Sequence, residues 1–131
     1  MEAFFGSWKF VKSENFTEYL IALGMAHETI KVWNSLKPTL NFSKEGVDVV
    51  LKMEANDHTK EISFKLDQEF DETIGDGKNA KSVVYLEGDK LVHIQKWDDK
   101  QSTVTREVKG RQMVMTLEAE DIVAVCTYER A

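Results

Sequence analysis

Residues 15–36 read NFTEYLIALGMAHETIKVWNSL, and this is the one stretch of the chain that has a helical repeat. Its apolar side chains recur at steps of three and four residues in two runs, as in a pair of amphipathic helices. The first run is Phe16, Tyr19, Leu20 and Leu23, and the second is Ile30, Trp33 and Leu36. Asn15 and Glu18 fit a capping box, Gly24 is suited to end the first helix, and Pro38 stops the second. The stretch predicts a helix-turn-helix.

The remaining sequence alternates apolar and polar residues with a period of two, which indicates β-strands. The predicted strands cover residues 5–11, 39–43, 47–54, 58–66, 69–74, 79–87, 90–97, 102–109, 112–119 and 122–130. Short turns rich in Gly, Asn and Asp separate them and favour hairpins in up-and-down order. We therefore predict an all-β chain, a ten-stranded antiparallel β-barrel or β-clam, with residues 15–36 as a helical lid over an internal cavity.

Composition limits the classes of function. The 131 residues suffice for one domain spanning 1–131. A net charge of -6 and a pI near 5.1 disfavour DNA and RNA as partners. No apolar run approaches the roughly 18 residues of a membrane span, and Met1 to Phe10 lacks the pattern of a signal peptide. The single cysteine, Cys126, agrees with a reducing compartment, so a cytoplasmic protein is expected.

Catalysis and metal binding have little support in the sequence. His27, His58 and His93 show no ligand spacing, so no metal and no cofactor are implied. An enzyme would need Cys126 as a nucleophile with His93 as its base, yet nothing in the sequence activates this thiol. The sequence therefore favours a binding protein over an enzyme or a metalloprotein.

One inward-facing charge stands out in the alternation. On the strand at 102–109, Val104, Arg106 and Val108 share the inner face. A guanidinium cannot lose its charge, so in an apolar interior it requires an anion or several acceptors. A cavity with one fixed cation suits an amphiphile with a carboxylate head and a hydrocarbon tail, as in a fatty acid. The alternative is that Arg106 pairs with an internal carboxylate such as Glu72.

Several separated motifs resemble one known family. They are Gly6-Ser7-Trp8-Lys9-Phe10, Ser13-Glu14-Asn15-Phe16, Tyr19, Phe64-Lys65-Leu66, Glu69-Phe70-Asp71-Glu72-Thr73, Asp76-Gly77-Lys78, Lys81-Ser82, Leu91-Val92-His93-Ile94-Gln95-Lys96-Trp97 and Tyr128-Glu129-Arg130-Ala131. Together they are similar to the intracellular fatty acid-binding proteins, cytosolic lipid-binding and lipocalin-like carriers of the calycin superfamily. The resemblance spans the whole chain and is to the vertebrate muscle, adipocyte and myelin-type members.

The resemblance implies a fatty acid whose carboxylate meets two arginines and a tyrosine. Arg106 and Tyr128 match this trio, whereas Cys126 stands where the second arginine is expected. The loss of one bidentate cation leaves two readings open: Arg106 carries more of the carboxylate contact, or the cavity favours retinoids, esters or other neutral lipids. Asp76 is expected near the head group, either paired with Arg106 or facing water.

The remaining expected contacts are with the lipid tail and around the opening of the cavity. The residues expected there are Phe16, Tyr19, Met25, Trp33, Pro38, Met53, Asp76, Gln95, Met115, Leu117 and Cys126. The opening differs from that of the near relatives at Ile30, Trp33 and Asp57. Expected partners are a long-chain fatty acid or related hydrophobic ligand and, transiently, a membrane at the helical lid. The chain is expected to be a monomer that carries fatty acids between membranes and enzymes.

Overall fold

The computed structural model describes residues 1–55, 58–74 and 77–131, which form ten antiparallel strands, two α-helices and a short 3-10 helix, η1 (Glu2–Phe4). The helices are α1 (Phe16–Ala22) and α2 (His27–Ser35). The strands are β1 (Gly6–Glu14), β2 (Thr39–Glu45), β3 (Asp48–Ala55), β4 (His58–Phe64), β5 (Phe70–Ile74), β6 (Lys78–Glu87), β7 (Lys90–Trp97), β8 (Lys100–Lys109), β9 (Gln112–Ala119) and β10 (Ile122–Arg130). The ten-stranded prediction is confirmed.

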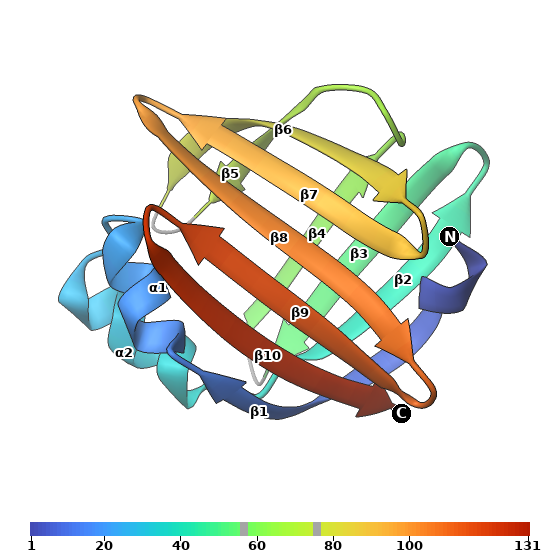
Figure 1. Ribbon diagram of the computed structural model, residues 1–131, viewed down its shortest axis with the longest axis horizontal. Helices are drawn as coiled ribbons and strands as arrows, with labels where there is room; N and C mark the ends of the chain where they lie inside the picture. The colour runs from blue at the N-terminus through green and yellow to red at the C-terminus, as the bar shows by residue number, and fades with distance from the viewer. Residues whose placement is uncertain (56–57, 75–76) are drawn as a thin grey trace.

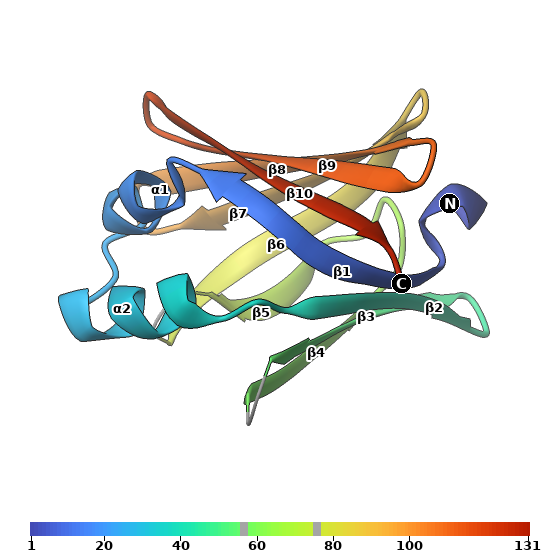
Figure 2. The same ribbon diagram turned by 90° about the horizontal axis from the view of Figure 1, so that it is seen from below.

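The strands form one continuous sheet in the order β4-β3-β2-β1-β10-β9-β8-β7-β6-β5. The sheet folds over on itself, so that β2–β5 lie behind β6–β10 in Figure 1 and below β7–β10 in Figure 2. Strands β1 and β10 come from opposite ends of the chain and pair with each other, for example through Trp8 and Arg130. This pairing brings the two ends of the chain together.

The edges of the sheet, β4 and β5, are not paired to each other in the part of the chain that the structure describes. Side chains span this gap instead. The ammonium of Lys60 on β4 donates a hydrogen bond of 2.8 Å to the carbonyl oxygen of Thr73 on β5. The rings of Phe64 and Phe70 stack with centroids 5.5 Å apart. The barrel is thus closed at this seam by side chains rather than by a backbone ladder.

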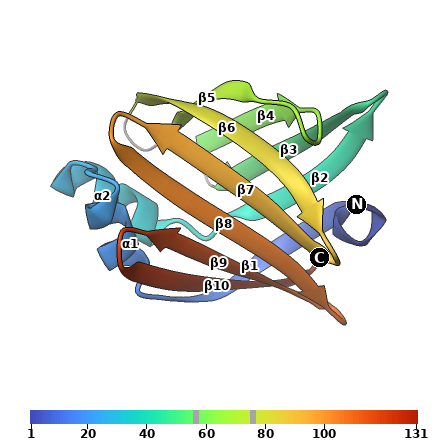
Figure 3. The same cartoon turned by 45° about the horizontal axis from the view of Figure 1, so that its top comes forward.

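The two helices lie together at one end of the folded sheet, opposite η1 (Figures 1 and 3). Helix α1 packs on β10 and β9 and contacts α2. Lys78 on β6 also holds it, because its ammonium donates hydrogen bonds of 2.9 and 3.2 Å to the carbonyls of Leu23 and Gly24. These carbonyls belong to the C-terminal cap of α1 and to the residue after it, where a cation is favourable. The predicted helical lid is confirmed.

The capping box at Asn15 is wrong. Asn15 has φ 59°, in the left-handed region, and its side chain caps no helical amide. The Asn15 amide nitrogen instead donates a hydrogen bond of 3.3 Å to the carbonyl oxygen of Val123 on β10. The Asn15 side chain therefore makes a tertiary contact with β10 in place of the predicted capping hydrogen bond within the helix.

Some boundaries also differ. The strand predicted at 47–54 begins at Asp48 instead, and Val47 lies in the turn before β3 and is 76% exposed. Strand β1 continues to Glu14, beyond its predicted end at Val11, because a bulge after Phe10 shifts the register and restores pairing with β10. A bulge of this kind is difficult to predict from the pattern of apolar and polar residues in one strand, because it is defined by the pairing with the neighbouring strand.

The end of the barrel away from the helices is sealed by a packed core. Trp8 is fully buried, and its indole nitrogen donates a hydrogen bond of 3.0 Å to the Phe4 carbonyl oxygen. The guanidinium carbon of Arg130 lies 4.0 Å from the centre of the Trp8 ring. Arg130 also donates hydrogen bonds of 2.6 Å to the carbonyls of Phe5 and Ala3, so the last strand is fastened over η1.

None of the helices in the described ranges has the length and apolar character required to cross a membrane.

Candidate functional site

A cavity of about 230 Å³ lies inside the folded sheet and beneath the lid. The expected ligand-contacting residues that the structure describes all line it, namely Phe16, Tyr19, Met25, Trp33, Pro38, Met53, Gln95, Arg106, Met115, Leu117, Cys126 and Tyr128. Asp76 and Asp57 lie outside the described residues. The wall is largely aliphatic and aromatic, so it suits a hydrocarbon chain.

Arg106 is the buried cation of this cavity. Its residue is 8% exposed, and its Nε is enclosed without a hydrogen-bond partner among the described residues. The guanidinium carbon lies 5.6 Å from the ring centre of Phe42. Burial lowers the pKa of Arg106, while the nearby Tyr128 and Glu72 oppose this effect. An unsatisfied guanidinium in an apolar cavity is the physical signature of an anion site.

The expected alternative, direct pairing of Arg106 with Glu72, is wrong. Both residues are described, and no ion pair within 4.0 Å joins them. Glu72 instead accepts three hydrogen bonds at one oxygen, Oε1: 2.6 Å from Ser82 Oγ, 2.6 Å from His93 Nε2 and 3.0 Å from Gln95 Nε2. The carboxylate has its own donors, so no carboxylate among residues 1–55, 58–74 and 77–131 pairs with Arg106 at contact distance.

Tyr128 and Cys126 stand beside Arg106 on the wall. Met115 on β9 is paired with Arg106 on β8 and with Cys126 on β10, so these three residues lie on one rung of the sheet. Burial raises the pKa of the Cys126 thiol to about 11 and raises that of the Tyr128 phenol. Tyr128 therefore remains a protonated donor, and Cys126 remains a neutral thiol that cannot replace a guanidinium.

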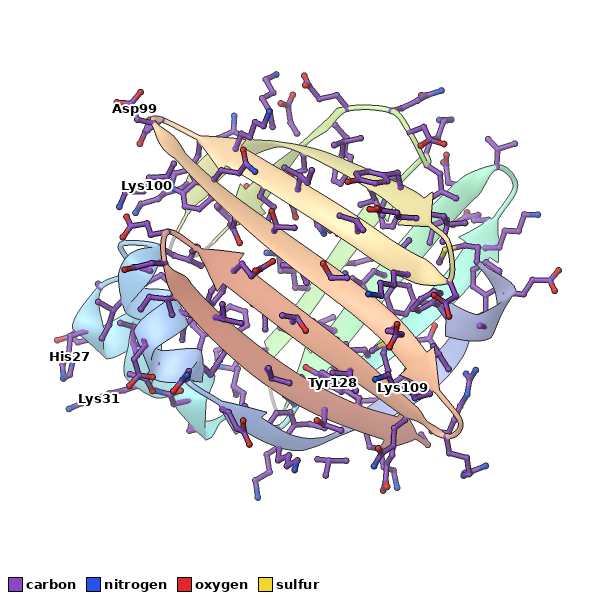
Figure 4. All side chains as sticks on the ribbon, in the orientation of Figure 1. His27, Lys31, Asp99, Lys100, Lys109 and Tyr128 are labelled. Carbon is purple, nitrogen blue, oxygen red and sulfur yellow. The ribbon has the colours of Figure 1, made fainter. Side chains whose placement is uncertain are left out.

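The lid contributes a further polar contact to the wall. The hydroxyls of Tyr19 on α1 and Ser102 on β8 are hydrogen-bonded to each other in a buried position. Burial raises the pKa of Tyr19, so its phenol stays neutral. In contrast, His27 and Lys31 on α2 extend outward, away from the sheet and from Tyr128 (Figure 4). The outward side of α2 thus carries titratable side chains (Figure 4), whereas Phe16, Tyr19 and Trp33 of the two helices line the cavity.

Several wall residues were not anticipated from the sequence. Lys60 and Asn34 line the cavity although both lie in polar stretches of sequence. Glu72 was considered only as a partner for Arg106. On β5, buried and exposed side chains alternate, so Glu72 lies on the same inner face as Ile74. This alternation is the feature of the sequence from which an inward-facing Glu72 could have been predicted. No signal in the sequence distinguishes Lys60, because its contact with Thr73 depends on the unpaired seam.

The pKa of Glu72 shows how the hydrogen bonds in the cavity wall contribute to the stability of the fold. Burial alone would raise its pKa, but hydrogen bonds from His93, Ser82 and Gln95 outweigh burial and lower the pKa from 4.5 to about 2. Because this pKa is depressed in the folded chain, the ionised carboxylate stabilises the fold above about pH 4.5, and that contribution is lost as the pH falls toward 2.

We therefore expect the stability advantage of the wild type over Glu72→Gln to shrink by roughly 2 kcal/mol between pH 7 and pH 2.5. Urea unfolding across this range measures the advantage. Glu61→Gln, which changes an exposed carboxylate on β4, serves as the control and should show a nearly constant difference. An advantage over Glu72→Gln that does not vary with pH would contradict the prediction.

Metal binding finds no support in the site. Within residues 1–55, 58–74 and 77–131, no group of three or more His, Cys, Asp and Glu side chains is arranged to hold a metal ion.

A family model described as the lipocalin / cytosolic fatty-acid binding protein family matches residues 5–129. The chain belongs to this family. Its fold and the family resemblance of its motifs are thereby confirmed, and the family with its fatty-acid-binding members consists of carriers rather than enzymes.

Solved structures agree over the full length. A fatty acid-binding protein from the brain of Drosophila melanogaster is 41% identical, over 96% of this chain and 98% of that one, with a TM-score of 0.91. The fluorescent protein UnaG is 43% identical, over 99% and 98%, with a TM-score of 0.93. The Schistosoma mansoni fatty acid binding protein in complex with arachidonic acid is 32% identical, over 100% and 98%, with a TM-score of 0.95. These neighbours do not show the vertebrate muscle, adipocyte or myelin subtype.

Proposed function

We propose that this protein is an intracellular carrier of long-chain fatty acids, with the tail in the cavity and the carboxylate held by Arg106 and Tyr128. The observation that carries the proposal is the buried Arg106 guanidinium on the cavity wall, which has no ion-pair partner within 4.0 Å among the described residues. The Schistosoma relative, which was solved with arachidonic acid, supports the same ligand class. Binding a carboxylate would give the guanidinium a charge-assisted hydrogen-bond partner.

The tail supplies most of the affinity in this proposal. About 15 methylenes at ~0.8 kcal/mol each give roughly 12 kcal/mol before the costs of immobilisation. The head-group contact then decides selectivity: a charge-assisted hydrogen bond to a single arginine contributes about 1.5–3 kcal/mol. Because Cys126 leaves one arginine where the resemblance implies two, the preference for an acid over a neutral lipid is the quantity to measure.

The proposed carrier acts as a monomer in the cytoplasm and moves fatty acids between membranes and enzymes. Delivery would involve transient contact of the lid with a bilayer, for which the exposed Ile21 and Val32 on α1 and α2 offer apolar contacts. The alternative cargo is a retinoid or a neutral lipid, and the absence of a second guanidinium at Cys126 is the observation that favours it.

The test is displacement of a fluorescent fatty acid by oleate, methyl oleate and retinoic acid, after extraction of any lipid that copurifies. We expect oleate to bind about 10- to 100-fold more tightly than methyl oleate in the wild type, and this preference to disappear in Arg106→Met. Arg130→Met, which removes a guanidinium outside the cavity, should retain the preference. Equal binding of acid and ester by the wild type would shift the cargo to neutral lipids, and tightest binding of retinoic acid would make it a retinoid carrier.

A further inference from the structure

The cavity has a second polar feature in addition to Arg106, namely the carboxylate of Glu72. The side chain of Glu72 is 3% exposed, and Glu72, His93 and Gln95 all line the cavity. Glu72 comes from β5, Ser82 from β6 and the other two from β7, so three adjacent strands converge on one carboxylate. Nothing in the carriage of a simple fatty acid requires a negative charge in this wall.

The two oxygens of this carboxylate differ. A carboxylate oxygen has two lone pairs, and Oε1 already accepts hydrogen bonds from Ser82, His93 and Gln95. Oε2 accepts none from the described residues. It is also not enclosed in the protein, because the enclosed, unpartnered side-chain atoms in the described ranges belong to Asp48, Trp97 and Arg106. Oε2 is therefore an open acceptor on a side chain that lines the cavity.

The chemistry of this acceptor is restricted to one kind of ligand group. An ionised carboxylate only accepts hydrogen bonds, so a hydroxyl fits it and a carbonyl oxygen is repelled. The low pKa of Glu72, about 2, means that the group remains an acceptor throughout the physiological range. A donor held by a buried carboxylate forms a short, charge-assisted bond.

The acceptor is separate from the anion site. Arg106 and Glu72 form no ion pair within 4.0 Å, so Arg106 remains available for a carboxylate while Oε2 remains available for a donor. A molecule that satisfies both groups has one acidic end and one neutral O–H group along its chain.

We propose that Glu72 Oε2 is a second polar contact for the ligand and that the cavity selects long-chain fatty acids bearing a hydroxyl group on the hydrocarbon chain. This inference rests on the proposed fatty acid carriage and names its preferred substrate class. In a purely apolar cavity a hydroxyl weakens binding, because the group loses its water without gaining a partner. Glu72 supplies that partner at one position along the chain.

The substitution Glu72→Gln provides a sharp test because the donors fix its orientation. Ser82, His93 and Gln95 donate to Oε1 of the wild-type carboxylate, so we expect the amide oxygen of the glutamine to keep this place and its amide nitrogen to take the position of Oε2. The open acceptor thereby becomes an open donor. A donor in this position favours a keto group on the ligand over a hydroxyl.

The experiment measures displacement of a fluorescent fatty acid by stearate and by positional series of monohydroxystearates and monooxostearates. We expect one hydroxy isomer to bind the wild type at least about fivefold more tightly than stearate and about tenfold more tightly than the oxo acid of the same position. In Glu72→Gln the preference between hydroxy and oxo acids at that position should reverse. Ser82→Ala, which removes one donor to Oε1 and leaves Oε2 in place, should keep the wild-type order.

The outcomes separate this inference from the proposed function. If stearate binds more tightly than every hydroxy isomer in the wild type, the inference is overturned while fatty acid carriage stands. The same holds if Glu72→Gln leaves the order of hydroxy and oxo acids unchanged. If neither stearate nor any substituted acid displaces the probe, fatty acid carriage itself fails.

Discussion

Replacing Trp8 by alanine is expected to lower the free energy of unfolding by about 3–5 kcal/mol. Trp8 is 0% exposed, so its removal leaves a cavity that the surrounding strands cannot readily fill. The change also removes the donor to the Phe4 carbonyl oxygen and the aromatic face against which Arg130 lies, 4.0 Å from the ring centre. Since β1 pairs with both β2 and β10, the loss affects the point where the first and last strands of the chain meet in the sheet.

Urea unfolding of Trp8→Ala and Trp8→Phe separates the packing from the hydrogen bond. Trp8→Phe keeps most of the ring volume but has no N–H, so we expect it to lose only about 1–2 kcal/mol. The site lies at the end of the barrel away from the lid, and Trp8 does not line the cavity. Oleate affinity of the folded variants should therefore stay close to that of the wild type. A loss below 1 kcal/mol for Trp8→Ala would contradict this account of the sealed end.

The second large effect has the opposite sign: Arg106→Met should raise the free energy of unfolding of the ligand-free protein by about 2–4 kcal/mol. Arg106 is a buried cation whose Nε has no hydrogen-bond partner and which forms no ion pair within 4.0 Å, as far as the described residues are concerned. Methionine has a similar length and flexibility, and it fills the same space without a charge that must be desolvated. The wild type would then be less stable because its cavity is prepared for an anionic ligand.

The control for this prediction is Arg130→Met. Arg130 is also an arginine of the barrel wall, but it donates to the carbonyl oxygens of Phe5 and Ala3 and lies against Trp8. Its loss leaves two acceptors without donors, so Arg130→Met should destabilise the protein. Chemical unfolding of delipidated protein, with and without oleate, measures both variants. Oleate should stabilise the wild type more than Arg106→Met, and destabilisation by Arg106→Met would refute the unpaired-charge interpretation.

The strands were largely predictable because a half-buried strand must place its apolar residues on one face. Met113, Met115 and Leu117 alternate along β9, and all three are buried. The errors fall where pairing rather than alternation decides the boundary. Val47 continues the apolar period but lies in a tight turn, and the bulge that extends β1 depends on the register of β10. Asn15 has the chemistry of a helix cap, yet the carbonyl of Val123 is the acceptor its side chain reaches.

For the cavity, the sequence by itself determined which chemistry faces inward. The period of two placed Arg106 on an inner face, while the family resemblance implied Tyr128 as its companion and an arginine where Cys126 stands. Alternation reports a face but not the distance between strands, so it could not decide whether Glu72 neutralises Arg106. Only the tertiary structure decided that, because it brings Ser82, His93 and Gln95 to one oxygen of Glu72 and forms no ion pair between Glu72 and Arg106. A hydrogen bond forms only if its donor–acceptor distance is right to within less than about one ångström, and such distances between strands are fixed by the closure of the whole sheet.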